Sequence, residues 1–219
     1  MTSIVSRPSL LIGVIGTNTE VGKTWVTAQV VATLKLRGTQ VAARKPVQSY
    51  APDDINTDAA LLAGASGEDV SDICPAHRCY PIALAPPMAA TALGRGPLWM
   101  SEIVSEVRWP ANIDIGFVET VGGVRSPLSC DGDSLDLLRR LNVDRMLLVA
   151  DAELGTINAV RLTLAAVGST PTVVYLNRFQ PDNALHELNR RWLVEQDQLH
   201  VITDVHSLAV VLESVCKAA

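Results

Sequence analysis

The chain has 219 residues, of which 48% are apolar and 19% charged, and its 18 basic and 23 acidic residues give a net charge of −5. This apolar content excludes intrinsic disorder, which needs low hydrophobicity and high net charge. The acidic balance disfavours nucleic-acid binding, because contacts with a phosphate backbone require a basic surface. The length fits one domain, and we expect a single domain over residues 1–219.

The sequence also disfavours membrane insertion and export. The longest uncharged stretch, Cys79–Gly94, is short for a bilayer span and contains three prolines. The N-terminal segment lacks the apolar core and cleavage site of a signal peptide. The cysteines form no CxxC pair and show no metal-ligand spacing. We therefore expect a cytoplasmic protein that binds neither membrane nor nucleic acid, with reduced and mostly buried cysteines.

Apolar runs that predict strands alternate along the chain with segments of helical periodicity. The predicted strands cover residues 10–15, 40–44, 113–118, 145–150 and 171–176. The predicted helices cover residues 23–37, 134–141, 156–167, 184–195 and 207–216, with a shorter helix from residue 58. Alternating strands and helices imply right-handed crossovers. We therefore predict an α/β fold of three layers, in which a mainly parallel sheet carries helices on both faces and binds its ligand beyond the carboxyl ends of the strands.

The strongest motif joins the first predicted strand to the first predicted helix. It runs Gly16-Thr-Asn-Thr-Glu-Val-Gly22-Lys23-Thr24. A phosphate chain needs backbone N–H donors, a cation and a helix N-terminus, and this segment supplies all three. Lys23 would reach the β- and γ-phosphates, and the Thr24 hydroxyl would bind Mg²⁺. Thr17 occupies the first glycine position of the strict pattern, and a glycine turn before a core helix is the alternative. The flanking elements favour a nucleotide site.

A second candidate segment follows the second predicted strand. Here Lys45 lies at the strand end, and Pro46 favours extended backbone at the lysine. An ammonium group beside a phosphate loop can neutralise a transferring phosphoryl group. Without the phosphate loop, a solvated lysine would be the default interpretation.

Carboxylates follow two further elements. Asp58 begins the short predicted helix, where it could cap the helix, bind a metal or do both. Glu119 ends a buried strand just before Gly122 and Gly123, a position that suits an Mg²⁺ ligand beside a phosphate. Asp114 lies at the opposite end of that strand, so we expect it to face solvent.

Other nucleotide-binding classes fit less well. ParA- and MinD-type ATPases carry an additional lysine in the loop where this chain has Asn18. GTPases carry an Asn-Lys-x-Asp motif, whereas the last predicted strand leads into Asn177-Arg178-Phe179-Gln180.

Taken together, these motifs resemble those of the dethiobiotin synthetase family. The family's GTDTEVGKT loop corresponds to residues 16–24, its KPVxS segment to residues 45–49 and its SDA to residues 57–59. Its VEGAGG corresponds to residues 118–123, its LGTINH to residues 154–159 and its adenine-binding asparagine to Asn177. The motifs occur in the family's order over residues 10 to 180, roughly.

The resemblance implies an ATP- and Mg²⁺-dependent cyclo-ligase of biotin synthesis. In this family, 7,8-diaminononanoate reacts with CO₂ to give a carbamate, and ATP phosphorylates the carbamate oxygen. The second amine then closes the cyclic urea, dethiobiotin, and phosphate is released. The family works as a homodimer whose site is completed across the interface.

The implied site residues fall into overlapping groups. The nucleotide would be bound by Gly16, Thr17, Asn18, Thr19, Glu20, Val21, Gly22, Lys23, Thr24, Glu119, Gly122, Gly123 and Asn177. The metal ligands would be Thr24, Asp58 and Glu119, and the catalytic donors and charges Thr19, Lys23, Lys45 and Ser49. The diamine would be bound by Thr19, Lys45 and Ser49, together with Gly155, Thr156 and Asn158 of the partner subunit.

The chain departs from the family pattern at several places. Asn18 replaces an aspartate, Thr120-Val121 replace Gly-Ala, and Ala159 replaces a histidine. Residues 200–204 replace the Gly-x-Ile-Pro segment that completes the adenine pocket. These changes leave two alternatives open. One is a divergent paralogue that carries out the same chemistry on another amine, and the other is a P-loop regulatory or partitioning ATPase.

Overall fold

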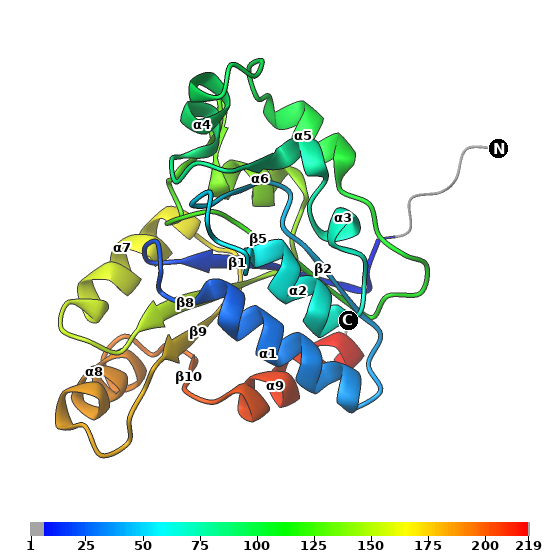
Figure 1. Ribbon diagram of the computed structural model, residues 1–219. Helices are drawn as coiled ribbons and strands as arrows, with labels where there is room; N and C mark the ends of the chain where they lie inside the picture. Colours follow the sequence, from blue (N-terminus) through cyan, green and yellow to red (C-terminus); the bar gives the residue numbers. More distant parts are fainter. Residues whose placement is uncertain (1–6, 219) are drawn as a thin grey trace.

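The computed structural model describes residues 7–218, and its centre is a six-stranded parallel sheet (Figure 1). The strand order is β10-β9-β8-β1-β5-β2. These strands are β1 (Leu10–Gly16), β2 (Val41–Arg44), β5 (Ile115–Glu119), β8 (Arg145–Asp151), β9 (Thr172–Asn177) and β10 (Val201–Ile202). Strand β1 is buried throughout, as the continuous apolar run predicts for a strand covered on both faces.

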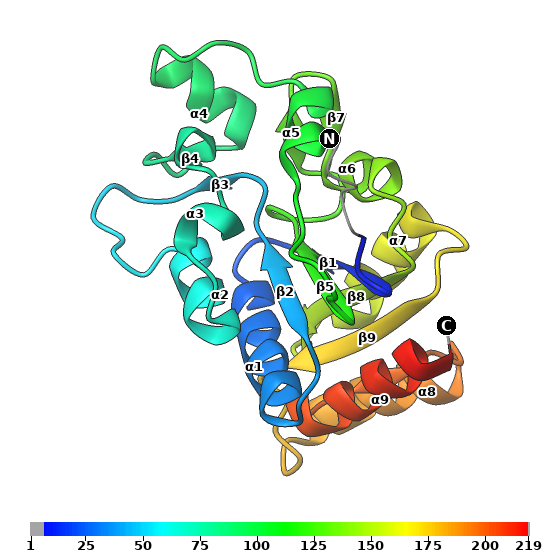
Figure 2. The same ribbon diagram turned by 90° about the vertical axis from the view of Figure 1, so that its right-hand side faces the viewer.

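Helices cover both faces of the sheet, and Figure 2 shows α1 and α2 on one side of the strands and α6 and α7 on the other. The first face carries α1 (Lys23–Leu36), α2 (Asp58–Ser66) and α9 (Val205–Ala218). The second carries α6 (Ser134–Arg140), α7 (Thr156–Val167) and α8 (Ala184–Glu195). Alternate residues of β1 supply the two cores, with Ile12 in the first and Ile15 in the second. The predicted α/β class is confirmed.

Shorter elements gather at one side of the sheet, where α4 and α5 lie at the top of Figure 1. They include α3 (Val70–Ile73), a 3₁₀ turn (Ala76–Arg78), α4 (Pro86–Ala92) and α5 (Met100–Glu106). They also include a parallel pair, β3 (Gln48–Ser49) with β4 (Cys79–Tyr80), and an antiparallel pair, β6 (Pro127–Ser129) with β7 (Gly132–Asp133). The sequence analysis predicted none of these, because elements of two to seven residues carry too little periodicity.

Asp114 is partly exposed, as expected, and its Oδ2 also accepts a hydrogen bond from the Gln40 amide at 2.9 Å just before β2. The expectation about the cysteines is wrong, since Cys130 is exposed and only Cys74 is fully buried. Within residues 7–218, no helix combines the length and the apolar character needed to cross a bilayer.

Candidate active site

The loop between β1 and α1 brings a lysine and free backbone donors to the carboxyl end of the sheet. Gly22 precedes α1 with φ 91°, a left-handed conformation that favours glycine. Lys23, the first residue of α1, donates from Nζ to the carbonyl oxygens of Gly122 at 2.8 Å and Asn18 at 3.3 Å. The first turn of α1 contains no acidic residue. This helix start is therefore open to an anion, as the sequence motif predicts.

The three predicted metal ligands come together from three different elements. Thr24 Oγ1, on α1, lies 2.8 Å from Asp58 Oδ1 on α2 and 2.6 Å from Glu119 Oε1 on β5. Asp58 does not cap its helix, because Thr57 does so by accepting a hydrogen bond from the Ala60 amide. The Asp58 carboxylate is thus directed into the site.

The donor set fits a magnesium ion. It consists of one hydroxyl and two carboxylates, the oxygen ligands that Mg²⁺ prefers. Glu119 Oε2 is buried, and among the described residues it has no hydrogen-bond partner, so a ligand position is left open. Within residues 7–218, no group of three or more His, Cys, Asp or Glu side chains is arranged so that it could hold a metal ion. Mg²⁺ commonly uses one or two carboxylates plus water and phosphate oxygens, so the set of Thr24, Asp58 and Glu119 is sufficient.

Lys45 lies in the middle of this cluster and is only 2% exposed, so the solvated-lysine interpretation is wrong. Its Nζ is 2.6 Å from Asp58 Oδ2, 2.8 Å from Glu119 Oε1 and 3.1 Å from the Thr120 carbonyl oxygen. Burial alone would lower the pKa of Lys45, but the two carboxylates outweigh it and raise that pKa above the usual value. Lys45 therefore carries a full positive charge.

The pKa values of Lys23 and Asp58 are shifted by burial and by the same neighbouring charges. Burial, together with the charge of Lys45, lowers the pKa of Lys23 to about 8 despite Glu119 and Asp58. Burial would raise the pKa of Asp58, but the charge and hydrogen bond of Lys45 lower it below its usual value. Asp58 is therefore ionised at neutral pH, as a metal ligand must be.

These groups border a cavity of about 800 Å³. The polar part of its lining comes from the phosphate loop, Lys45, Ser49 and Asp58. The apolar part includes Leu84, Pro86 and Val121, so part of the stretch Cys79–Gly94 lines the cavity. Among the predicted site residues, the lining set is Thr19, Glu20, Gly22, Lys23, Thr24, Lys45, Ser49, Asp58 and Gly122.

The other predicted nucleotide-binding residues do not line the cavity but contact residues of the phosphate loop. Asn177 Nδ2 donates a hydrogen bond to the carbonyl oxygen of Val21 at 3.0 Å. A Cβ at Gly16 would lie 3.1 Å from Lys23 Cδ, and a Cβ at Gly123 would lie 3.4 Å from the carbonyl oxygen of Thr17. Asn18 supplies its carbonyl oxygen to Lys23, and Glu119 supplies its carboxylate to Thr24.

Arg178 lines the cavity although the sequence analysis gave it no role. It directly follows β9 with φ 57°, and its Nη2 donates to the Glu20 carbonyl oxygen at 3.2 Å. This left-handed turn brings the guanidinium group back over the phosphate loop. A positive φ at an arginine has no clear sequence signal, which is why the residue was missed.

The structure does not bring Gly155, Thr156 and Asn158 to this cavity, since none of them is among the residues that line it. They form the start of α7, where Gly155 and Asn158 are exposed and Leu154 is 86% exposed. The Thr156 hydroxyl donates to the carbonyl oxygen of Asp151 at 2.8 Å. Within one chain, this segment is a separate surface.

Comparisons with known proteins identify similar sequences over most of the chain. A family model described as an AAA domain matches residues 11–213. A protein of Haloferax mediterranei named ATP-dependent dethiobiotin synthetase BioD is 35% identical over 194 residues, which cover 87% of this chain and 81% of that protein. The Aquifex aeolicus protein of the same name is 32% identical, with 82% of this chain and 81% of that protein covered.

Solved structures share the architecture at lower identity. A plasmid partition protein from Borrelia burgdorferi superimposes with a TM-score of 0.55 at 13% identity, covering 98% of this chain and 100% of its own. The chloroplast FtsY of Physcomitrella patens superimposes with a TM-score of 0.52 at 16% identity, covering 94% of this chain and 66% of its own. At these identities the likeness concerns the fold alone.

Proposed function

Because the chain belongs to the dethiobiotin synthetase family, we propose that it catalyses the ATP-dependent ring closure of 7,8-diaminononanoate with CO₂ to dethiobiotin, a step of biotin biosynthesis in the cytoplasm. The observation that carries this proposal is the position of Lys45. A generic P-loop hydrolase needs the loop lysine, whereas this chain buries a second cation beside the loop, within 2.8 Å of two carboxylates.

Thr24, Asp58 and Glu119 would hold a magnesium ion, which would offset the negative charge of the triphosphate. The unpartnered Glu119 Oε2 and the lowered pKa of Asp58 support this assignment. Lys23 would bind the β- and γ-phosphates from the start of α1. The remaining loop residues would supply backbone N–H donors.

Lys45, Thr19 and Ser49 would bind the reacting end of the diamine. A carbamate oxygen that attacks the γ-phosphate brings two anions together, and a preorganised ammonium group at that point lowers the barrier. Thr19 and Ser49 both line the cavity and carry hydroxyl donors. Leu84, Pro86 and Val121 would contact the alkyl chain, since they are apolar residues in the lining of the same cavity. Asn177, at the end of β9, would bind the base.

We also propose that the active form is a homodimer in which α7 of one subunit completes the site of the other. Gly155, Thr156 and Asn158 would then bind the distal carboxylate of the diamine at the helix N-terminus. The exposure of Leu154 at this helix start supports a partner there.

Complementation in trans tests the shared site. Lys23→Gln would inactivate the phosphate side, and Gly155→Asp would repel the substrate carboxylate, with no atom within 4 Å of the new Cβ. Aspartate tolerates the left-handed backbone at this position. Co-expression of the two inactive chains should restore activity, because one site of each mixed dimer is intact. No restoration would contradict a site shared between subunits.

The function itself is tested by incubating the protein with ATP, Mg²⁺, bicarbonate and 7,8-diaminononanoate. Mass spectrometry should detect the cyclic urea, formed together with phosphate and only when all four components are present. Phosphate release that depends on another amine would favour the paralogue. ATP hydrolysis that no amine stimulates would favour a regulatory ATPase.

A further inference from the structure

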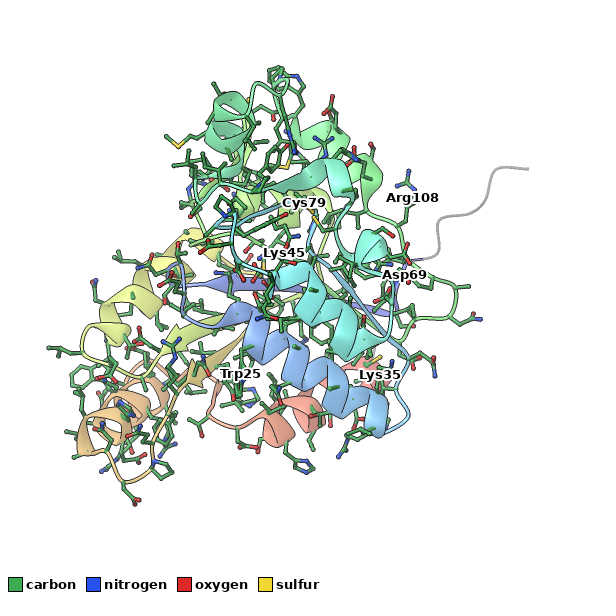
Figure 3. The ribbon with its side chains drawn as sticks, viewed as in Figure 1. Trp25, Lys35, Lys45, Asp69, Cys79 and Arg108 are labelled. Carbon is green, nitrogen blue, oxygen red and sulfur yellow. The ribbon has the colours of Figure 1, made fainter. Side chains whose placement is uncertain are left out.

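Two cysteines, Cys74 and Cys79, lie close together next to residues 45–49. Cys74 follows α3 and is buried, and Cys79 begins β4 and is partly exposed. Their Sγ atoms are 3.6 Å apart, and neither residue takes part in the proposed mechanism. In the view of Figure 3, Cys79 is labelled above Lys45.

The segment between these cysteines is joined to the active site at both ends. Ile73, next to Cys74, accepts a hydrogen bond from the Lys45 amide at 2.9 Å. Cys79 pairs with Gln48 in the β3–β4 ladder, and Gln48 Nε2 also donates to Cys79 Sγ at 3.2 Å. A movement of this segment would therefore be transmitted to residues 45–49.

Gln48 extends this connection to the metal ligands. Its Oε1 accepts a hydrogen bond from the amide of Ala59 at 3.0 Å. Ala59 directly follows Asp58, whose carboxylate contacts both Lys45 and Thr24. The Cys79 sulfur is thus linked to Asp58 through a single side chain, that of Gln48.

The surroundings of the pair also favour reaction at Cys79. The hydrogen bond between the two thiols lowers the pKa of Cys79 to about 6, with help from Gln48, Arg95 and His77 and against the effect of burial. The thiolate is the nucleophilic form of cysteine, so a lowered pKa favours attack by Cys79. Cys74 lies at contact distance as the second thiol.

We propose that Cys74 and Cys79 are a redox-active dithiol that a low-molecular-weight disulfide converts to an intramolecular disulfide, and that this bond slows the reaction in the adjoining cavity. The Cys79 thiolate attacks one sulfur of the reagent, which forms a mixed disulfide and releases one thiolate. Cys74 passes its proton to that thiolate and attacks Cys79 Sγ, so that the second half of the reagent leaves as a thiolate and takes a proton from solvent. Two cysteine thiols are oxidised, and the reagent is reduced to two thiols.

The expected effect on catalysis follows from the change in distance. A disulfide bond is about 2.05 Å long, so the two sulfurs must approach by roughly 1.5 Å. That movement displaces β4 relative to Gln48, and a misplacement of about 1 Å in an active site can cost about a hundredfold in rate. We expect oxidation to lower turnover at least about tenfold. This consequence depends on the proposed function, whereas formation of the disulfide does not.

The first experiment tests the bond without any activity measurement. The folded protein is treated with oxidised glutathione, free thiols are alkylated, and the protein is digested with trypsin. Cleavage after Arg78 separates the two cysteines, so only a disulfide can hold the peptide ending at Arg78 to the peptide beginning at Cys79. Mass spectrometry should find this linked pair, which dithiothreitol should separate. Unlinked peptides, or Cys79 joined to Cys130 or Cys216, would overturn the proposal.

The second experiment tests the consequence in wild-type, Cys74→Ser and Cys130→Ser proteins. Oxidised wild type and the exposed-cysteine control Cys130→Ser should lose turnover at least about tenfold and recover it with dithiothreitol. Cys74→Ser should keep its turnover after the same oxidation. If substitution of this buried residue prevents folding, Cys79→Ser is used as the variant instead. If oxidised Cys74→Ser lost as much turnover as the wild type, another modification would be the cause. If the wild type contained the disulfide but kept its full turnover, the bond would not affect the reaction in the cavity. Either result would overturn the inference.

Discussion

Helices α1 and α7 begin in the same way, yet only the first borders the cavity. Each follows a strand of the parallel sheet, and the two strands, β1 and β8, are neighbours. Each helix begins after a left-handed glycine, Gly22 with φ 91° and Gly155 with φ 96°. Around α1, three other segments contribute Lys45, Asp58 and Glu119. The start of α7 is instead a separate surface with Leu154 exposed.

This difference shows that a helix N-terminus is only part of a site. Free backbone N–H groups attract an anion with modest strength, and specificity requires further charges from other elements. The start of α1 has those charges within its own chain. In the proposed homodimer, the start of α7 would meet such charges only in the site of a second copy. Substitutions at the two helix starts should therefore have different consequences.

The largest effect is expected at the start of α1. Lys23→Gln should abolish measurable nucleotide binding and lower turnover about a thousandfold, because it removes the cation on the transferring phosphates. Calorimetry with ATP and Mg²⁺ would measure the binding. Lys217→Gln, an exposed lysine of α9, is the matched control and should behave as wild type. Intact ATP binding in Lys23→Gln would contradict a phosphate site at the start of α1.

A smaller loss, confined to catalysis, is expected at Lys45. Lys45→Gln should bind ATP much as wild type does but lower urea formation at least about a hundredfold, the effect of losing one preorganised donor. Lys45→Arg should also be impaired, because a planar guanidinium does not replace a compact ammonium in a buried site. A thermal melt would separate this effect from the loss of the buried ion pairs. Near wild-type product formation in Lys45→Gln would contradict a catalytic role.

The pH dependence of nucleotide binding provides a third test. The pKa of Lys23 is lowered to about 8, mainly by burial, so above that pH the ligand-free protein holds this lysine neutral. Phosphate binding favours the charged form, so the protein must take up a proton. ATP affinity should therefore fall as pH rises above about 8, by up to about tenfold per pH unit. Calorimetry in buffers of different ionisation enthalpy measures the proton uptake, and a flat affinity profile would argue against Lys23 as the phosphate ligand.

At the start of α7 we expect an effect on the diamine alone. Asn158→Ala should raise the KM for 7,8-diaminononanoate about tenfold to a hundredfold, the effect of one hydrogen bond to a charged group, and leave ATP affinity unchanged. Steady-state kinetics with each substrate varied in turn would separate the two constants. A change in ATP affinity would place this segment beside the nucleotide. The two helix starts would then not differ in the ligand that they bind.

The smallest effect is expected at Arg178. Arg178→Ala should weaken ATP binding by about threefold, since it removes one hydrogen bond that positions the phosphate loop. Arg191→Ala, on the exposed face of α8, is a suitable control. A loss of a hundredfold or more would mean that Arg178 contacts the phosphates directly.

The sequence was sufficient to predict five of the six strands of the sheet, the long helices and the cluster of Thr24, Asp58 and Glu119, whereas the two-residue strand β10 was missed. Parallel strands end at the same edge of a sheet, so polar residues after separate strands converge there. Burial of Lys45 was not predictable, because it depends on how the loop around Asp58 folds back. The β3–β4 pair that joins Gln48 to Cys79 was missed because two-residue strands leave no pattern in a sequence.

Gly22 has a consequence for how this site can change over evolution. A Cβ at this position would lie 2.1 Å from Asn177 Nδ2, the group that holds the carbonyl of Val21. Any larger residue would force the asparagine away, and its left-handed φ would be strained as well. With Asn177 as the proposed base-binding residue, phosphate binding and base selection would share one point of contact, so neither could be altered there independently. A lineage that acquires a different nucleotide preference must keep this glycine and make its changes elsewhere around the base.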